Sequence, residues 1–394
     1  MNPFDQAILL SQLRAFQLDA LNRQIAYAKT HSPYYRRVLA PLPLPLTRLE
    51  DITLLPFLTA EQLAGSGPEL VCLPSSRIER IVSLQTSGSV HSKRLYFSEN
   101  DLERTIAFFS AGMRYMTAPG QTVAVCMPGS TPNGISDLLC RGLKRLGARP
   151  VHIGSITDYA STAELLRSCQ PHTIVGIPHQ IRRLALLAPD LRPTNVLLSS
   201  DYLPSGTKVL LQRQWQCEVF DHYGLTESGY GCAVECPRHE GAHIRHDELI
   251  LEIVDPVSGA PLPPGNWGEI VLTTLHREAM PLLRYRTGDR GRLLTQPCSC
   301  GSVLPRLDRV AGRVRLLEET PNIYQLEELL SGMDSIWDFS ARRINNGVDI
   351  RLLTLHPTAV EEVRRDLARL FPDHEILVHA SNDLAVGPGK RKIL

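Results

Sequence analysis

Two short segments carry side chains suited to binding a nucleotide and its cation. Residues 221–227 read DHYGLTE and residues 285–289 read YRTGD. Tyr223 offers a flat face for a planar ring, whereas Glu227 and Asp289 supply carboxylates for a cation or for hydroxyl groups. A glycine in each segment lets the backbone approach a ligand closely or adopt a positive φ. We expect two ligand-holding loops, although either one alone is also typical of an ordinary turn.

A third segment has the composition of a phosphate-binding loop. Uncovered backbone N–H groups and Ser/Thr hydroxyls can surround phosphate oxygens, and a lysine adds positive charge. The candidate residues lie between two expected strands: Thr86, Ser87, Gly88, Ser89 and Lys93. An ordinary turn has a similar composition, so the phosphate assignment depends on the other motifs.

Cysteine and histidine residues gather in two later segments. The first segment contains Cys232, Cys236, His239, His243 and His246, and the second, residues 298–301, reads CSCG. Thiolates with imidazole at close spacing select tetrahedral Zn²⁺. Four protein ligands would make the zinc structural, holding two loops together. Reduced cysteines without a metal are the alternative.

The elements that must position these residues alternate between helix and strand. Helical spacing of apolar residues predicts a helix over 6–30. Strand-like runs separated by helical segments follow at 122–127, 150–153, 172–177 and 195–199. This alternation predicts an α/β fold with a parallel sheet covered by helices on both faces. Residues 249–254 and 268–273 predict antiparallel strands of a separate β layer.

The pattern of expected helices and strands changes near residues 312–313. A small unit follows, with helices expected at 325–330 and 359–370 and strands at 348–355 and 375–379. We therefore expect two domains, a large one over 1–312 and a small α+β one over 313–394.

Composition narrows the class of protein. The chain has 394 residues and 43% hydrophobic content, enough for two or more domains. Its 42 basic and 41 acidic residues nearly cancel in charge, so the chain has no strong overall electrostatic field. We therefore expect no nucleic-acid or membrane partner. No apolar run approaches the ~20 residues needed to span a bilayer, and no secretory signal is visible. Nine cysteines, an odd number, favour reduced thiols and a cytoplasmic location.

Together these segments resemble the adenylate-forming (acyl-CoA synthetase) superfamily, specifically its phenylacetate–CoA ligase branch. Residues 273–289 (TTLHREAMPLLRYRTGD) are similar to the "TTL-R-x-x-MP-L-RYRTGD" run of that branch, and 32–35 (SPYY) and 55–57 (LPF) extend the resemblance. The resemblance implies a large N-terminal adenylate-binding domain of parallel sheets flanked by helices plus a β layer. It also implies a mobile C-terminal cap.

The resemblance implies a role for each candidate around the nucleotide. Tyr223, beside Gly224, would stack on adenine, and Asp289 would accept from the ribose hydroxyls. Arg309 would reach the ribose or phosphate. Residues 86–89 and Lys93 would bind phosphate.

Three further residues would take part in catalysis. Thr226 would contact the α-phosphate, Glu227 would hold Mg²⁺, and Lys390 would neutralise charge between the carboxylate and the α-phosphate. Lys392 is the alternative to Lys390.

Some relatives in this branch also carry a cysteine and histidine pattern typical of metal ligands. On this sequence the pattern falls on Cys236, His243, Cys298 and Cys300. Cys232 and His239 remain the reserve candidates for this structural Zn²⁺ site.

The implied reaction activates a carboxylic acid, expected to be aromatic, with ATP to give an acyl-adenylate and then a coenzyme A thioester. One rival passes the acyl group to an amine or carrier protein instead of CoA. Another is a nucleotide-binding protein without turnover, suggested by the shortened loop at 90–92 and by Val314-Arg315, where the family has an acidic hinge residue. A homodimer is left open.

Overall fold

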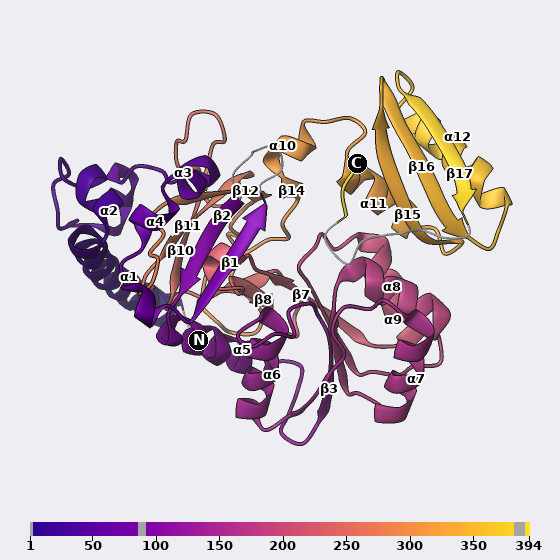
Figure 1. Ribbon diagram of the computed structural model, residues 1–394, viewed down its shortest axis with the longest axis horizontal. Helices are drawn as coiled ribbons and strands as arrows, with labels where there is room; N and C mark the ends of the chain where they lie inside the picture. The colour runs from indigo at the N-terminus through magenta and orange to yellow at the C-terminus, as the bar shows by residue number, and fades with distance from the viewer. Residues whose placement is uncertain (1–2, 86–91, 382–390) are drawn as a thin grey trace. The chain divides into compact units, whose positions relative to one another are not determined.

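The computed structural model describes residues 3–85, 92–381 and 391–394 (Figure 1). The chain folds into two compact units, each made of two stretches of sequence. Unit 1 comprises Met1–Gly112 and His222–Val310, and unit 2 comprises Met113–Asp221 and Ala311–Leu394. Within the described residues no helix is long and apolar enough to cross a membrane.

Unit 1 begins with helices and a hairpin. Its first half contains α1 (Pro3–His31), α2 (Pro33–Val38), η1 (Leu49–Leu54), α3 (Ala60–Gly65), α4 (Gly67–Leu70), η2 (Ser75–Arg77), β1 (Arg80–Gln85), β2 (Ser92–Phe97) and α5 (Glu99–Met113). The strands β1 and β2 are antiparallel. Ser32 begins α2 because its hydroxyl accepts a hydrogen bond from the backbone N–H of Tyr35.

The second half of unit 1 is mainly antiparallel sheet. Its elements are the end of β7 (Glu218–Tyr223), η3 (Thr226–Ser228), β8 (Ala233–Glu235), β9 (Ala242–Ile244), β10 (Leu249–Val254), β11 (Gly268–Thr274), β12 (Tyr285–Gly291) and β13 (Arg306–Leu307). The predicted β layer is present, since β10 pairs with β11 in antiparallel register and β11 pairs with β12. A second set pairs β9 with both β8 and β13.

The motif YRTGD forms a strand rather than the predicted loop. Its residues make up most of β12, and Tyr285, Thr287 and Asp289 are buried on one face of it. The pairing with β11 supplies the backbone hydrogen bonds that a loop of this composition would lack. The motif DHYGLTE likewise begins inside β7, and only its second half is a turn.

The first stretch of unit 2 carries the predicted parallel strands. They run in the order β4 (Arg149–His152), β3 (Thr122–Cys126), β5 (Thr173–Gly176) and β6 (Asn195–Ser199), and β7, which the sequence pattern did not predict, lies next to β6 in the same sheet. The helices between them are α6 (Ile135–Leu146), α7 (Tyr159–Cys169), α8 (Pro178–Leu187) and α9 (Ser205–Trp215). Figure 1 shows α7, α8 and α9 on one side of β3 and α6 on the other. A buried cluster around Ile174, Leu184 and Trp215 joins α7, α8 and α9 to the strands.

The second stretch of unit 2 has its own sheet and hydrophobic cluster. It contains β14 (Gly312–Arg313), α10 (Val314–Leu317), α11 (Ile323–Ser331), β15 (Ile336–Ile344), β16 (Gly347–Thr354), α12 (Thr358–Leu370) and β17 (Glu375–Ser381). Strand β16 pairs antiparallel with β15 and parallel with β17, and Figure 1 shows α12 beside this sheet. The core includes Leu326, Ile350 and Leu367. The sequence pattern missed β15, while the domain boundary at 312–313 stays a prediction.

Candidate functional site

A buried ion pair connects two of the predicted site residues. Lys93 lies on β2 and Glu227 on η3, and the Lys93 ammonium donates to Glu227 Oε1. Their side chains are only 11% and 5% exposed. Burial alone would raise the pKa of Glu227, but the Lys93 ammonium holds that pKa below its ordinary value. The carboxylate is therefore ionised, as a cation ligand must be.

Tyr285, on β12, contacts both members of this pair. Its hydroxyl donates to Glu227 Oε1 at 2.9 Å and lies 3.2 Å from Lys93 Nζ. The Lys93 ammonium also lies 5.7 Å from the centroid of the Tyr285 ring. The sequence analysis assigned this tyrosine no role of its own, although it stands first in the YRTGD motif.

A second contact lies at the other end of the same strand face. The hydroxyl of Tyr223 donates to Asp289 Oδ2 at 2.8 Å. Burial and the neighbouring Asp289 raise the pKa of Tyr223, so the phenol stays protonated and can donate. Asp289 lies four residues after Tyr285 on β12, within a stretch where the register with β11 shifts. The predicted adenine and ribose residues are thus adjacent, and β12 joins them to the predicted cation residue.

The turn after Tyr223 requires the glycine found there. A Cβ at Gly224 would lie 2.2 Å from the carbonyl oxygen of Tyr230. The turn closes because the N–H of Tyr230 donates to the carbonyl of Leu225 at 2.9 Å, and the N–H of Cys232 donates to that of Tyr223 at 3.0 Å. This packing fixes Thr226 and Glu227 relative to Tyr223.

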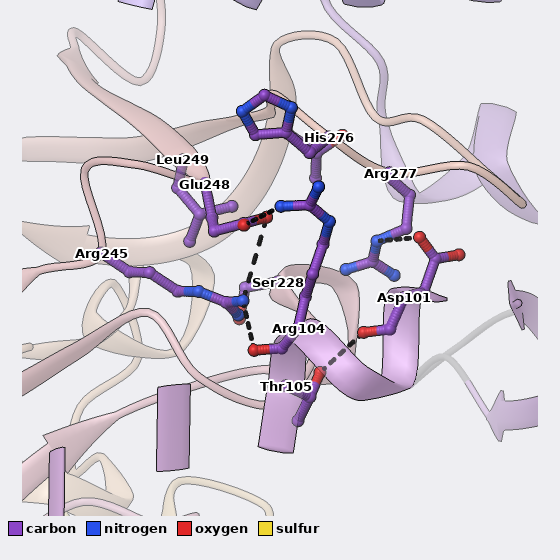
Figure 2. A pocket seen from close by; sticks show the side chains of 10 residues that line it. Asp101, Arg104, Thr105, Ser228, Arg245, Glu248, Leu249, His276 and Arg277 are labelled. Carbon is purple, nitrogen blue, oxygen red and sulfur yellow. Dashed lines mark hydrogen bonds and ion pairs between the residues drawn. The ribbon is translucent and has the colours of Figure 1, made fainter. Parts of the chain in front are cut away.

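A small polar pocket borders this turn. Figure 2 shows Arg104, Arg245 and Arg277 gathered there with acidic partners. Arg104 pairs with Glu248 at 2.5 Å, and Arg277 lies 3.9 Å from Asp101. These charges largely compensate one another, which favours a supporting role over ligand binding.

Arg277 links this pocket to the predicted cation residue. Its guanidinium donates to the carbonyl of Glu227 at 3.5 Å and lies 4.8 Å from the centroid of the Phe97 ring. A Cβ at Gly229 would come within 2.8 Å of the same guanidinium. The run of residues 273–289 thus contributes to this site from two directions, a relation that the sequence did not reveal.

Some predicted residues are not brought into this arrangement. Residues 86–89 and Lys390 lie outside the described part of the chain. Arg309 is exposed on the segment after β13, and its backbone N–H donates to Asp308. Lys392 is exposed beside the chain end, which forms a bridge between Ile393 and Ala341 of β15.

The predicted metal residues do converge. The ligand atoms of Cys236, His243, Cys298 and Cys300 all lie within 4.8 Å of one another. Cys236 Sγ lies 3.7 Å from Cys298 Sγ, and Cys300 Sγ lies 3.5 Å from His243 Nε2. A tetrahedral zinc with its usual bond lengths requires S–S and S–N edges of about 3.8 and 3.6 Å. These two distances match the edges of such a site, and the group of four, with its ligand atoms within 4.8 Å of one another, is compact enough to close on a zinc.

The sheet and a buried arginine hold the loops that carry these ligands. His243 is on β9 opposite Arg306 of β13, and Cys236 follows β8. The Arg306 guanidinium donates to the carbonyls of Glu240 and Gln296, one on each loop. Burial and the nearby Arg306 lower the pKa of His243, which favours the neutral imidazole that metals bind.

The reserve metal candidates lie elsewhere. Cys232 is fully buried and outside the group, and His239 is 3.0 Å from the carboxylate of Glu235. All nine cysteines are free thiols in the structure.

Known proteins resemble the chain over most of its length. It is 28% identical over 389 residues to a phenylacetate–coenzyme A ligase of Thermus thermophilus, a match that covers 95% of this chain and 80% of that protein. It is also 28% identical over 350 residues to an Escherichia coli protein of the same name, covering 83% and 78%. No family model matches the chain.

Solved structures establish the fold. A 2-hydroxyisobutyryl-CoA ligase in its postadenylation state superposes with a TM-score of 0.82, at 20% identity, over 96% of this chain and 88% of that one. The α/β fold predicted from sequence, with parallel strands flanked by helices and separate sheets, is therefore confirmed.

Proposed function

We propose that this relative of the phenylacetate–CoA ligases, built on the fold of adenylate-forming CoA ligases, activates a carboxylic acid with ATP and transfers it to coenzyme A. One observation carries the proposal. A single strand, β12, places Tyr285 against the Lys93–Glu227 pair and Asp289 against Tyr223. The residues expected at the phosphate end and at the nucleoside end of one nucleotide are thus fixed on the same strand face.

The first step makes the acid reactive. A carboxylate is a poor electrophile, so its oxygen attacks the α-phosphorus of ATP, and the bond to the leaving pyrophosphate breaks. The resulting mixed anhydride is then open to attack by a thiol at the acyl carbon, with AMP leaving. The protein's main task is to position two anions and reduce their repulsion.

The side chains that would do this carry complementary charge. Lys93 would bind phosphate oxygens, and Glu227 would hold Mg²⁺, which supplies neutralisation of the phosphates when bound. Thr226, next to Glu227, would contact the α-phosphate. Lys390 and the loop at 86–89 are expected to add donors, and their placement stays a prediction.

The nucleoside would be held by the second contact. The ring of Tyr223 would stack on adenine, beside the close backbone packing at Gly224. Asp289 would accept hydrogen bonds from the ribose hydroxyls. These bonds would replace part of its interaction with the Tyr223 hydroxyl. Arg309, on an exposed segment, would approach the ribose or phosphate.

The remaining parts have supporting roles. Cys236, His243, Cys298 and Cys300 would hold a structural zinc, because four protein ligands leave no open position for substrate. The C-terminal residues 313–394 would act as the mobile cap that admits the thiol after adenylation. The relatives' names favour an aromatic acid as substrate.

Pyrophosphate release measured over a panel of aryl and alkyl acids tests this function. We expect acid-dependent release, followed by an acyl-CoA identified by mass spectrometry when CoA is added. Glu227→Gln should reduce release by about 10²–10³-fold, as losing a cation ligand from a preorganised site does. Glu252→Gln is the matched control, since Glu252 is also a buried carboxylate with a basic partner, Arg284, but has no expected ligand role.

Two other outcomes would contradict parts of the proposal. Acyl-adenylate formation with transfer to amines or a carrier protein, but not to CoA, would overturn the proposed acceptor. Tight ATP binding with no pyrophosphate release for any acid would overturn the ligase activity itself.

A further inference from the structure

Lys93 and Glu227 neutralise each other in the structure, although they are expected to bind different groups. Both side chains are buried, so the attraction between their charges is screened far less than at the surface. The Lys93 ammonium already donates to Glu227 and to Tyr285, so it has one N–H left for a phosphate. A divalent cation on Glu227 would be repelled by an ammonium in direct contact with the same carboxylate. Loading with Mg²⁺·ATP therefore favours separation of this ion pair.

Charge remains balanced after such a separation. Lys93 would exchange a carboxylate oxygen for a phosphate oxygen, and Glu227 would exchange an ammonium for a divalent cation. Each buried charge keeps a partner of opposite sign, which avoids the large penalty of leaving one alone. The exchange needs only side-chain movement, provided that one group keeps Glu227 in place while its partner leaves.

Tyr285 is built to be that fixed group. It is 1% exposed, and its backbone lies between β11 and the segment at Leu58. The N–H of Leu58 donates to the carbonyl of Arg284 at 3.0 Å, and the N–H of Arg286 donates to the carbonyl of Leu58 at 2.9 Å. The Tyr285 phenol is therefore held in place when the Lys93 or Glu227 side chain moves. Its one proton is directed at Glu227, and its lone pairs face Lys93.

We propose that Tyr285 is a positioning residue for this exchange: its hydroxyl holds the Glu227 carboxylate while Lys93 leaves it for the nucleotide, and the Lys93–Glu227 pair excludes cations until then. The inference rests on the proposed function, because it assigns the order in which that site's charges change partners. It adds a role for Tyr285 and a competition between Lys93 and the cation.

Isothermal titration with Mg²⁺·ATP, in the absence of acid, tests the role of Tyr285. Tyr285→Phe should weaken binding about tenfold, the effect of losing one hydrogen bond to a charged group. Tyr35→Phe is the matched control. Its tyrosine is also buried, but the partners of its hydroxyl among the described residues are the backbone groups of Pro281 and Leu283. Tyr35→Phe should bind as the unmodified chain does, and melting curves would show that both variants fold.

Binding of Mn²⁺ alone, followed by electron paramagnetic resonance, tests the competition. Lys93→Met should bind Mn²⁺ at least tenfold more tightly than the unmodified chain, because the ammonium no longer occupies Glu227. The double variant Lys93→Met/Glu227→Gln should lose that gain, which would assign it to Glu227.

Three results would overturn the inference. Unchanged Mg²⁺·ATP affinity in Tyr285→Phe would refute the positioning role, and unchanged Mn²⁺ affinity in Lys93→Met would refute the competition. If the unmodified chain itself bound no Mg²⁺·ATP, the proposed function would fail together with this inference, a result distinct from the other two.

Discussion

Glu327 in unit 2 provides a quantitative test of the electrostatics that anchor the end of the chain. The guanidinium of Arg391 donates to Glu327 at 2.9 Å and contacts Asp338, while the Arg391 N–H donates to Asp201 at 3.0 Å. Two carboxylates thus contact one guanidinium and a third accepts from the backbone N–H of the same residue, with Arg183 3.4 Å from Asp338. Burial is the main reason that the pKa of Glu327 rises from 4.5 to about 7. The Arg391 guanidinium lowers this pKa, and repulsion from Asp201 and Asp338 offsets part of that lowering.

The direction of the pH dependence follows from this raised pKa. Between pH 4.5 and 7 the folded chain keeps a proton on Glu327 that the unfolded chain has released. Its stabilising contribution is therefore complete below pH 4.5 and is lost as the pH rises through 7. A change from 4.5 to about 7 corresponds to about 3 kcal/mol. For a unit of 150–250 residues this equals about 6–12 °C in Tm.

Glu327→Gln removes the titration while keeping the shape of the protonated acid. Thermal melts should show equal Tm for the variant and the unmodified chain at pH 5. At pH 8 the variant should melt higher by up to about 6–12 °C. Glu361→Gln, which changes an exposed glutamate on α12, should follow the unmodified chain at both pH values. A Glu327→Gln variant that melts lower at pH 8 than at pH 5, relative to the unmodified chain, would refute the reasoning by showing that folding stabilises the ionised carboxylate of Glu327 and not its protonated form.

Three further predictions concern unit 1. Elemental analysis should find about one zinc per chain, and Cys298→Ser should lose it whereas Cys232→Ser keeps it; equal zinc in both variants would contradict the ligand set. Gly224→Ala should lower the Tm by several degrees and abolish pyrophosphate release, because its Cβ would lie 2.2 Å from a carbonyl oxygen; a fully active variant would exclude this packing. Tyr223→Phe should raise the KM for ATP about tenfold with little change in kcat, since only the hydroxyl that orients Asp289 is lost; an unchanged KM would argue against Asp289 as the ribose acceptor.

Elements with a strong periodic pattern were predictable from sequence. The strands at 249–254 and 268–273 pair as expected because each is a short, mainly apolar run and a turn-rich segment joins them. The four metal candidates converge because antiparallel pairing of β8, β9 and β13 brings their loops to one place. The residue types of both features are visible in the sequence, although the convergence of the metal candidates also depends on pairing between the distant strands β9 and β13.

Other features depend on pairing between distant segments. The YRTGD motif has the composition of a turn, but pairing with β11 and the bond from the Gly288 N–H to Glu269 make it a strand. Strand β15 was missed because Asp338 and Arg342 interrupt its apolar pattern. Lys93 and Glu227 are 134 residues apart, and no local signal indicates which of the many charges pair.

The structure of crystals soaked with ATP, Mg²⁺ and a competent acid would test the central proposal most directly. We predict an adenylate with its adenine against the ring of Tyr223, its ribose hydroxyls on Asp289 and its phosphate within reach of Lys93, with Glu227 released to the cation. A nucleotide bound elsewhere in the molecule, with the Lys93–Glu227 and Tyr223–Asp289 contacts unchanged, would contradict it.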